Sequence, residues 1–326
     1  MKLATFRDAR GSRIGIVRPD AGAADTIFDL AAADAGLTDM LMLIEAGPAG
    51  LARAEAALRA RGADGALSRP LAAVELLAPL PRPVQMRDAM SYATHIRQSG
   101  AGTRRLAALL AGDAEAAANV VPAADIDPVY RARPIYYLTN RMTVGAPGSV
   151  VHWPRYSRVA DFELELAAII GRTGRDIPAA DAAAHIFGYT IFNDFSARDA
   201  QMLEMPGRLG PAKGKSFDGS NVLGPWITTA DEIPDPQALA VRVRVNGAVW
   251  AENTTAGMLF PWPDMVAYIS RDETLHAGEV IGSGTIGNCT GLEQGRFLHD
   301  GDTVELEIER IGILRNRIAM PQGSAV

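Results

Sequence analysis

The sequence contains a single cysteine, Cys289, among its 326 residues. One cysteine excludes a disulfide within the chain and a cysteine-rich zinc site, and such sparse use of cysteine fits a reducing compartment. Apolar runs of about 18 residues, the length that spans a bilayer, are also missing. Arg7 and Asp8 interrupt the N-terminal segment before an apolar signal-peptide core can form. We therefore expect a cytoplasmic protein that does not bind membranes.

Clustered positive charge is missing as well. Lys and Arg total 32 residues against 38 for Asp and Glu, a formal charge of −6, and the basic residues are spread along the chain. Without a basic block, the sequence offers no footprint for nucleic acid or anionic lipid. Apolar residues make up 48% of the chain and charged residues 21%, which is ordinary for a globular protein. An anionic small molecule would have to meet local basic groups.

Length and proline content predict two parts. At roughly 100 to 200 residues per domain, 326 residues correspond to about two domains. The stretch Pro79-Leu80-Pro81-Arg82-Pro83 cannot continue a helix or a central strand. We place the boundary there, so that residues 1–80 form a small N-terminal α+β domain. Residues 81–326 then form the larger domain, where the candidate functional residues lie.

Strand patterns outnumber helix patterns in the larger part. The strand candidates there are residues 162–170, 189–193, 241–245, 280–283, 303–308 and 313–317. In the N-terminal part, residues 2–6 and 14–17 read as a hairpin, and Pro48 begins a helix that ends at Gly62. We therefore predict an α+β fold with a β-rich core, and a doubly wound fold is disfavoured.

Three acidic residues alternate with apolar ones along one predicted strand. On a strand, Asp161, Glu163 and Glu165 share one face, although a solvated sheet face would give the same pattern. Asp194 adds a carboxylate at the end of a second apolar strand. Carboxylates from two segments, with one cysteine and five histidines in the chain, indicate a hard cation held by oxygen, such as Mg²⁺, Mn²⁺ or Ca²⁺.

A short helix is expected over residues 87–98. Asp88 and His95 are seven residues apart, so on a helix they would share a face and could reach one cavity. A lone histidine near a helix end is more often a packing or capping residue, so the spacing alone leaves catalysis open.

A second helix is expected to begin at Ser196. Ser196 with Asp199 resembles a capping box, and Arg198 and Gln201 would then share a face of that helix. A surface role for Arg198 is the plainer alternative.

Two glycine-containing segments could meet an anion. Residues 210–216, with the sequence GPAKGKS, place three residues between the glycines where a phosphate-binding loop has four, and no strand-loop-helix context surrounds them. We therefore reject nucleotide binding and interpret Lys215 as a basic group that is either solvated or directed at an anion. Residues 282–287 could offer backbone N–H groups and a hydroxyl to a carboxylate, and a plain turn is equally compatible.

The order of these motifs resembles the fumarylacetoacetate hydrolase family. The motifs are Arg87-Asp88-x6-His95, Phe162-Glu163-Leu164-Glu165, Asn193-Asp194-Phe195-Ser196-Ala197-Arg198-Asp199-x-Gln201, Gly214-Lys215-Ser216-Phe217 and Gly282-Ser283-Gly284-Thr285. The resemblance covers roughly residues 84–326. It implies a mixed β-sandwich roll, a homodimer and a small keto-acid substrate.

The resemblance also implies roles for individual residues. Ligands of Mg²⁺, or of Mn²⁺ or Ca²⁺, match Glu163, Glu165 and Asp194, with Asp88 as a further acid near the metal. His95 matches a general base, Glu293 is the candidate for its carboxylate partner, and Lys215 would face an oxyanion. Contacts to the substrate match Tyr137, Arg198, Gln201, Thr285 and, more weakly, Arg104.

The implied activity is hydrolysis of a C–C bond in a small 1,3-diketo acid, such as an acylpyruvate or fumarylacetoacetate. A divalent metal would polarise the carbonyl and stabilise the released enolate, while His95 takes a proton from water. Decarboxylation of a 2-keto diacid and keto-enol isomerisation can use the same metal platform. A non-catalytic scaffold, which metal would stabilise without turnover, is an alternative of another class.

Overall fold

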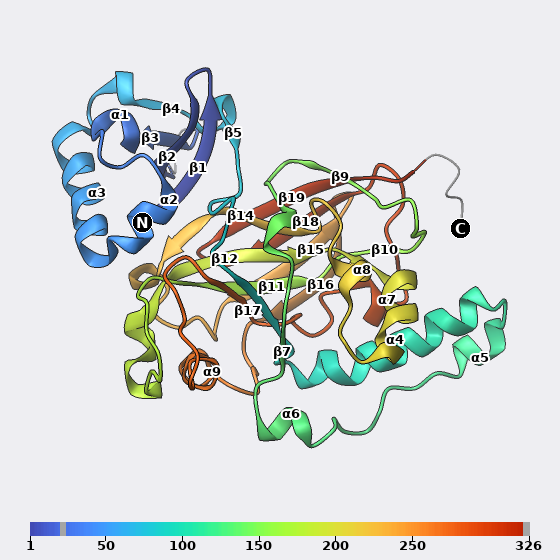
Figure 1. The fold of residues 1–326 in the computed structure, drawn as a ribbon. Helices are drawn as coiled ribbons and strands as arrows, with labels where there is room; N and C mark the ends of the chain where they lie inside the picture. Colours follow the sequence, from blue (N-terminus) through green and yellow to red (C-terminus); the bar gives the residue numbers. More distant parts are fainter. Residues whose placement is uncertain (20–23, 322–326) are drawn as a thin grey trace.

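The structure, a computed structural model, describes residues 1–19 and 24–321, and strands dominate it (Figure 1). The N-terminal strands are β1 (Lys2–Asp8), β2 (Gly11–Arg18), β3 (Thr26–Asp29), β4 (Ser68–Pro70) and β5 (Glu75–Leu76). They share a sheet with β6 (Met86–Ala89), β7 (Tyr136–Leu138), β8 (Val144–Gly145), β11 (Leu164–Ile170), β12 (Ile186–Asp194), β14 (Asn221–Thr229) and β17 (Val280–Gly282). A second sheet contains β9 (Val150–His152), β15 (Ala240–Val245), β16 (Ala248–Thr254), β18 (Thr303–Ile308) and β19 (Gly312–Ala319).

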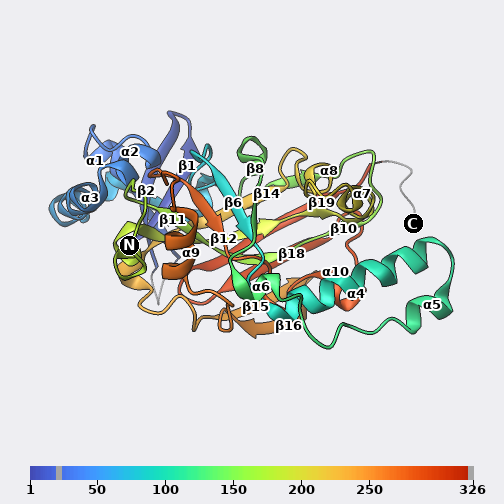
Figure 2. The ribbon, with the colours of Figure 1, turned by 60° about the horizontal axis from the view of Figure 1, so that its bottom comes forward.

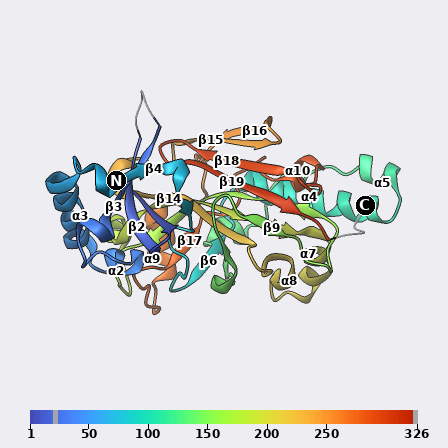
Figure 3. The same ribbon diagram turned by 90° about the horizontal axis from the view of Figure 1, so that it is seen from above.

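The large sheet has the order β4-β3-β2-β1-β14-β12-β11-β17-β6-β7, with β5 paired to β1 and β8 to β14. The second sheet has the order β16-β15-β18-β19-β9. It packs against one face of the large sheet, so that the two sheets form neighbouring layers (Figure 3). A short pair joins β10 (Ala160–Asp161) to β13 (Ser196–Ala197). The predicted α+β, β-rich fold is confirmed.

Helices lie around these sheets (Figure 2). The N-terminal part contains α1 (Leu30–Ala33), α2 (Met40–Glu45) and α3 (Gly47–Arg61). The remainder contains α4 (Ala93–Leu110), α5 (Ala114–Ala118), α6 (Val129–Ala132), α7 (Arg198–Glu204), α8 (Ala212–Lys215), α9 (Trp262–Ile269) and α10 (Gly291–Gln294). Among the described residues, none of the helices is both long and apolar enough to cross a bilayer.

Strand β11 is buried on both faces, and its alternate side chains belong to two different apolar clusters of the core. Every second side chain from Leu164 to Ile170 joins the apolar cluster that includes the valines of β15. Ala167 and Ile169 join a separate cluster with residues of the N-terminal helices. Because successive side chains alternate across a strand, Glu165 lies on the same face as Ala167. The sheet therefore directs this carboxylate away from the second sheet.

Within the large sheet, the N-terminal strands are joined to the strands of the larger part through β1, which pairs antiparallel with β14. The helices of the N-terminal part lie at one end of the molecule, whereas α4 and α5 extend from the other end in all three views (Figures 1, 2 and 3). The expected helix from Pro48 corresponds to α3, and Gly62 follows it as its C-terminal cap. The domain boundary near residue 80 stays a prediction.

The predicted helix that would carry both Asp88 and His95 is wrong. Residues Met86–Ala89 form β6, which pairs in parallel with β17, and α4 begins only at Ala93. The pairing partner lies far along the chain, so local periodicity could not reveal it. Helix α4 also continues to Leu110, beyond the expected end near Gln98.

The predicted capping box at Ser196 is wrong as well. Ser196 lies in β13, and α7 has Ala197 as its N-cap without a side-chain hydrogen bond. The Asp199 carboxylate instead accepts hydrogen bonds from the Ser157 hydroxyl at 2.5 Å and the Arg158 N–H at 2.8 Å. These partners, about 40 residues earlier in the chain, compete with the local cap.

Candidate active site

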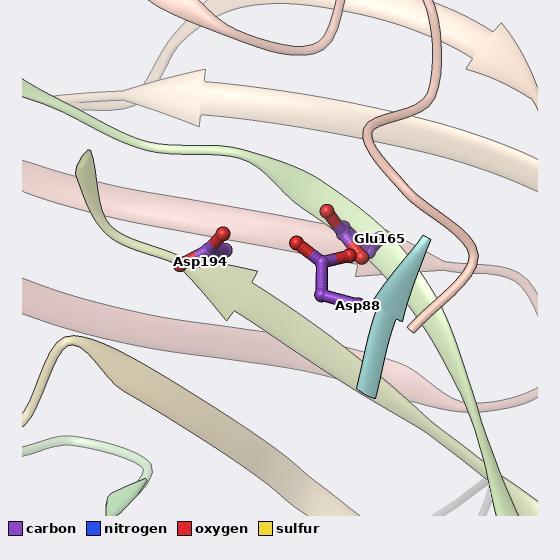
Figure 4. A group of neighbouring side chains, drawn as sticks. All are labelled: Asp88, Glu165 and Asp194. Atoms are coloured by element: carbon purple, nitrogen blue, oxygen red, sulfur yellow. The ribbon is translucent and has the colours of Figure 1, made fainter. Parts of the chain in front are cut away.

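Three buried carboxylates converge from three strands of the large sheet (Figure 4). Glu165 lies on β11, Asp194 ends β12 and Asp88 lies on β6. One oxygen of each carboxylate lies within 4.8 Å of the corresponding oxygens of the other two. The acids come from distant segments, and the sheet order β12-β11-β17-β6 brings them together.

Gly282 on β17 makes this convergence possible. Its strand runs between β11 and β6, where Gly282 pairs with Ala167 on one side and Asp88 on the other. A Cβ atom at this position would lie 2.6 Å from Glu165 Oε2 and 3.0 Å from Asp88 Oδ1. Any side chain at position 282 would therefore force the two carboxylates to move.

The three carboxylates fit a divalent cation. Asp88 Oδ1, Glu165 Oε1 and Asp194 Oδ1 are buried and have no hydrogen-bond partner among the described residues. Burial raises the pKa of all three carboxyls above their ordinary values, and mutual repulsion raises those of Glu165 and Asp194 further. Unpaired buried oxygens are costly, and an oxygen-only donor set suits a hard ion such as Mg²⁺, Mn²⁺ or Ca²⁺. The cluster can therefore hold a divalent metal.

Glu163, predicted as a metal ligand together with Glu165 and Asp194, lies beside this cluster but contacts two basic side chains of the protein. Its Oε1 accepts a hydrogen bond from Arg198 Nη2 at 2.6 Å, and its Oε2 accepts one from Lys215 Nζ. Although burial alone would raise it, Arg198 and Lys215 hold the pKa of the Glu163 carboxyl well below its usual range. Because Asp161, Glu163 and Glu165 are each at most 4% exposed, the reading of a solvated sheet face is excluded.

Lys215 is one of only three lysines in the chain, with Lys2 and Lys213. It ends α8 and is 3% exposed. Burial alone would lower its pKa, but Asp194 and Glu163 outweigh that effect and raise it. The ammonium group therefore stays charged beside the carboxylates, a role unlike that of a phosphate-binding loop.

A buried histidine that lines the cavity contacts a buried glutamate behind it. His95, in the first turn of α4, places Nδ1 3.0 Å from Oε1 of Glu293 on α10. Their side chains are 4% and 1% exposed. When Nδ1 donates this hydrogen bond to Glu293, Nε2 is the nitrogen that can take a proton.

A cavity of about 610 Å³ is lined by most of these groups, although Asp194 and Glu293 are not among its lining residues. Its lining includes Asp88, His95, Glu163, Glu165, Lys215 and Thr285. The volume falls within the range of roughly 300 to 1,000 Å³ that is usual for small-molecule sites. The cavity is therefore large enough for a small organic acid.

The predicted substrate contacts divide into two groups. Tyr137, Arg198, Gln201 and Thr285 line the cavity. Tyr137 donates its hydroxyl hydrogen to Asp194 Oδ2 at 3.2 Å, and Gln201 Oε1 accepts from Arg198 Nη1 at 2.8 Å. Arg104 lies apart from them: its guanidinium donates to the Val121 carbonyl oxygen at 3.0 Å, and it is not among the residues that line the cavity.

Part of the cavity wall was missed by sequence reasoning. Arg97 lines the cavity two residues after His95, and so do Asp125 and Tyr130 from the segment between α5 and β7. The only available signal for Arg97 was its place beside His95. In the segment 282–287, which could have offered backbone N–H groups to a carboxylate of a ligand, the N–H of Gly284 donates to the protein's own Glu165 Oε2 at 3.0 Å.

The family model described as fumarylacetoacetate (FAA) hydrolase C-terminal matches residues 88–319, which is more than half of the chain. The chain belongs to the fumarylacetoacetate hydrolase family. Its match to the family begins at Asp88 of the acidic cluster and includes the other two carboxylates.

Two similar family members are named as oxaloacetate tautomerases. Human mitochondrial oxaloacetate tautomerase FAHD2A is 38% identical over 188 residues, which are 57% of this chain and 59% of that protein. Oxaloacetate tautomerase YisK of Bacillus subtilis is 36% identical over 188 residues, 57% of this chain and 61% of that protein. The matched region thus spans about three fifths of these relatives.

Solved structures of the family resemble the whole chain. The fumarylacetoacetate hydrolase from Exiguobacterium antarcticum is 28% identical, with a TM-score of 0.71. The alignment covers 98% of this chain and 100% of that one. The N-terminal part, residues 1–80, is therefore included in the structural likeness.

Proposed function

We propose that this family member is a divalent-metal-dependent hydrolase that cleaves a C–C bond in a small 1,3-diketo acid, such as an acylpyruvate. The observation that carries the proposal is that His95, which contacts the buried Glu293, lines the same cavity as Asp88 and Glu165 of the carboxylate cluster. A metal site alone would serve many enolate reactions. Hydrolysis additionally requires a base that activates water, and this pair supplies one.

The carboxylate cluster and Lys215 would supply the metal site and a positive charge beside it. Asp88, Glu165 and Asp194 would hold the metal, with Mg²⁺ as the ion we propose. When bound, a divalent ion supplies Lewis-acid stabilisation of negative charge on carbonyl oxygens. Lys215 contributes a fixed positive charge next to this position.

The residues of the chain then perform the proton transfers. His95 Nε2 takes a proton from water, and the water oxygen bonds to the carbonyl carbon of the acyl group. Glu293 stabilises the imidazolium through Nδ1, while Lys215 faces the oxyanion. The C–C bond breaks with its electron pair going to the leaving 2-keto acid as an enolate, which takes the proton back at carbon. The products are a carboxylic acid and a 2-keto acid.

A panel assay tests this proposal. Acylpyruvates of increasing acyl length, fumarylacetoacetate and oxaloacetate are incubated with the purified protein and Mg²⁺, and both cleavage products are measured. We expect turnover of at least one 1,3-diketo acid, abolished by EDTA and restored by Mg²⁺. Stabilisation by Mg²⁺ without turnover of any keto acid would instead support the scaffold alternative.

A second candidate is keto-enol tautomerisation of oxaloacetate. It is favoured by the names of FAHD2A and YisK, which are 38% and 36% identical over 188 residues. The same His95 could move a proton between carbon and oxygen of the substrate without activating water. A change in enol absorbance with no carboxylic acid product would support this activity, whereas release of CO₂ would indicate a decarboxylase.

A further inference from the structure

Asp161 is a buried carboxylate that touches neither the cavity nor the three clustered acids. Its side chain is 0% exposed. Oδ2 accepts hydrogen bonds from Arg198 Nε at 2.7 Å, the Thr290 hydroxyl at 2.8 Å and the Leu292 N–H at 2.9 Å. Oδ1 accepts from the N–H groups of Gly291 at 2.8 Å and Phe162 at 2.9 Å. All five partners are donors.

These contacts join two parts of the proposed catalytic machinery. On one side, Arg198 continues from Asp161 to Glu163, which it contacts at 2.6 Å. On the other side, Asp161 holds the backbone at the start of α10, the helix that carries Glu293. The Thr290 hydroxyl closes the connection, because it donates to Asp161 and accepts from Arg198 Nη2 at 2.9 Å.

The start of α10 is fitted closely to this carboxylate. A Cβ atom on Gly291 would lie 2.5 Å from Asp161 Oδ1 and 2.0 Å from the Arg296 carbonyl oxygen. Helix α10 also packs against α4, since a Cβ on Gly102 would lie 2.4 Å from the Leu292 carbonyl oxygen. We therefore expect a shift at Asp161 to reach Glu293 and the helix that carries His95.

We propose that Asp161 is a positioning residue that sets Glu293 against His95 and Arg198 against Glu163 at the same time. The inference rests on the proposed function, in which His95 is the base. Asp161 does not contact the substrate. It acts by fixing two elements that belong to segments about 90 residues apart, α7 and α10.

Asparagine is a demanding test of this role. Asp161→Asn nearly preserves shape, but it replaces a charged acceptor of five hydrogen bonds with a group that has one acceptor oxygen and an NH₂ donor. The groups that now donate to one of the two carboxylate oxygens would then face the NH₂ group, which is itself a donor. We expect a shift of α10 and loss of the charge that Arg198 now contacts.

Asp29 provides a matched control. It is a buried aspartate in the N-terminal part that also accepts from arginines, Arg10 at 2.7 Å and Arg13 at 2.9 Å, and from a helical N–H. Asp29→Asn makes the same chemical change away from the cavity. Both variants should lose thermal stability. A loss of kcat in Asp161→Asn alone would then be a positioning effect and not a general effect of reduced stability.

The experiment compares wild type, Asp161→Asn, Asp29→Asn, Glu293→Gln and the double variant of Asp161 and Glu293. In Asp161→Asn we expect kcat to fall by about 10- to 10³-fold, with KM and Mg²⁺ affinity changed by less than about threefold. Asp29→Asn should keep wild-type kcat. The loss in the double variant should be smaller than the product of the two single losses, because both act through the same pair.

Fully multiplicative losses, or an unchanged kcat in Asp161→Asn, would overturn the inference. If Asp161→Asn does not fold, Thr290→Val is the alternative, because it removes the hydroxyl that bridges Asp161 and Arg198. It should lower kcat less than Asp161→Asn, again with little change in KM and Mg²⁺ affinity. Wild-type kcat in a folded Thr290→Val would then count against the role.

A readout without turnover separates this inference from the proposed function. The side-chain ¹⁵N resonances of the five histidines are recorded in the Mg²⁺-loaded proteins. The His95 resonance should move in Asp161→Asn toward its position in Glu293→Gln, and stay in place in Asp29→Asn. If wild type turns over no keto acid, the proposed function fails, while an unmoved His95 resonance refutes the positioning role independently.

Discussion

Lys215 Nζ lies 2.5 Å from Asp194 Oδ2, so a buried ammonium group borders the carboxylates that are proposed to hold a metal. The same ammonium contacts Glu163. A lysine in this position has two consequences. It compensates part of the negative charge in the protein without metal, and it fixes a positive charge beside any substrate that reaches the metal.

The first prediction is that Lys215→Met lowers turnover by about 10²- to 10³-fold, the range for losing an oxyanion contact. The metal-free variant should also be less stable, because removing one partner of a buried ion pair costs roughly 3 to 5 kcal/mol. Mg²⁺ should bind at least as tightly as in wild type, since a neighbouring positive charge is gone. Calorimetry measures the affinity for Mg²⁺, and thermal unfolding with and without EDTA measures the stability. A loss of Mg²⁺ affinity in the variant would contradict this assignment.

The rejection of a phosphate-binding loop at Lys215 predicts in addition that ATP does not bind to the wild-type protein, which calorimetry also tests.

The second prediction concerns the ligand set. Glu165→Gln removes a charged oxygen of the cluster while nearly keeping its shape, so Mg²⁺ affinity should fall by at least about 100-fold and activity should be lost with it. Unchanged affinity, measured by calorimetry, would remove Glu165 from the site. Glu163→Gln is the informative comparison: an equal loss would make Glu163 a ligand, as the family resemblance implies, whereas a smaller loss would leave it as the partner of Arg198 and Lys215.

The third prediction concerns Gly282. A methyl group there would meet Glu165 Oε2 and Asp88 Oδ1, so Gly282→Ala should weaken Mg²⁺ binding by about tenfold or more because the carboxylates must separate. Gly15→Ala on β2 is the control. Its Cβ would meet the Phe28 carbonyl oxygen at 2.6 Å, so it should lose stability but retain the affinity for Mg²⁺. Equal Mg²⁺ affinity in both variants would show that the cluster tolerates a side chain on β17.

The sequence predicted the acids of the site better than their connections. Alternation along residues 161–165 placed Glu163 and Glu165 on one face of a strand, because side-chain direction on a strand depends only on parity. The position of Asp88 was misread as helical, since β6 exists through its pairing with β17. Local patterns describe a segment, whereas the sheet order depends on contacts between distant segments.

The roles of Arg198 and Arg104 show the same limit. Arg198 was expected to hold the substrate, and it lines the cavity, but four of its hydrogen bonds go to Asp161, Glu163, Gln201 and Thr290. Partners up to 92 residues away decide how its guanidinium is used. Arg104 lies on α4 about two and a half turns after His95, and its guanidinium donates a hydrogen bond to the Val121 carbonyl oxygen. Motif matching could not separate these two arginines.

The fourth prediction concerns the pH dependence of the protein in EDTA. The pKa values of the Asp88, Glu165 and Asp194 carboxyls are raised in the folded protein, chiefly by burial. The folded state therefore binds more protons than the unfolded state above the ordinary carboxyl pKa of about 4. It follows that the stabilising contribution is complete below that pH and is lost as the pH rises through the raised values. Bound metal replaces the protons.

Thermal unfolding between pH 5 and pH 8, at about one-unit steps, checks this prediction with and without Mg²⁺. We expect the increase in Tm that Mg²⁺ produces to grow as the pH rises. Glu165→Gln should reduce that growth, because one raised carboxyl is gone. An increase in Tm that is the same at every pH in wild type would mean that the three acids are not coupled to protons in the metal-free protein.

The last prediction separates the base from the metal. His95→Ala removes the imidazole but none of the three clustered acids, so Mg²⁺ should bind within about threefold of wild type while hydrolysis falls by roughly 10²- to 10⁴-fold, the usual range for losing general acid-base catalysis. Glu293→Gln should lower hydrolysis less, since it leaves Nε2 in place and removes only the charge beside Nδ1. Wild-type turnover in His95→Ala would refute the assignment of the base. If hydrolysis falls and release of CO₂ from oxaloacetate survives, the protein has two activities on one metal site, because loss of CO₂ requires no activated water.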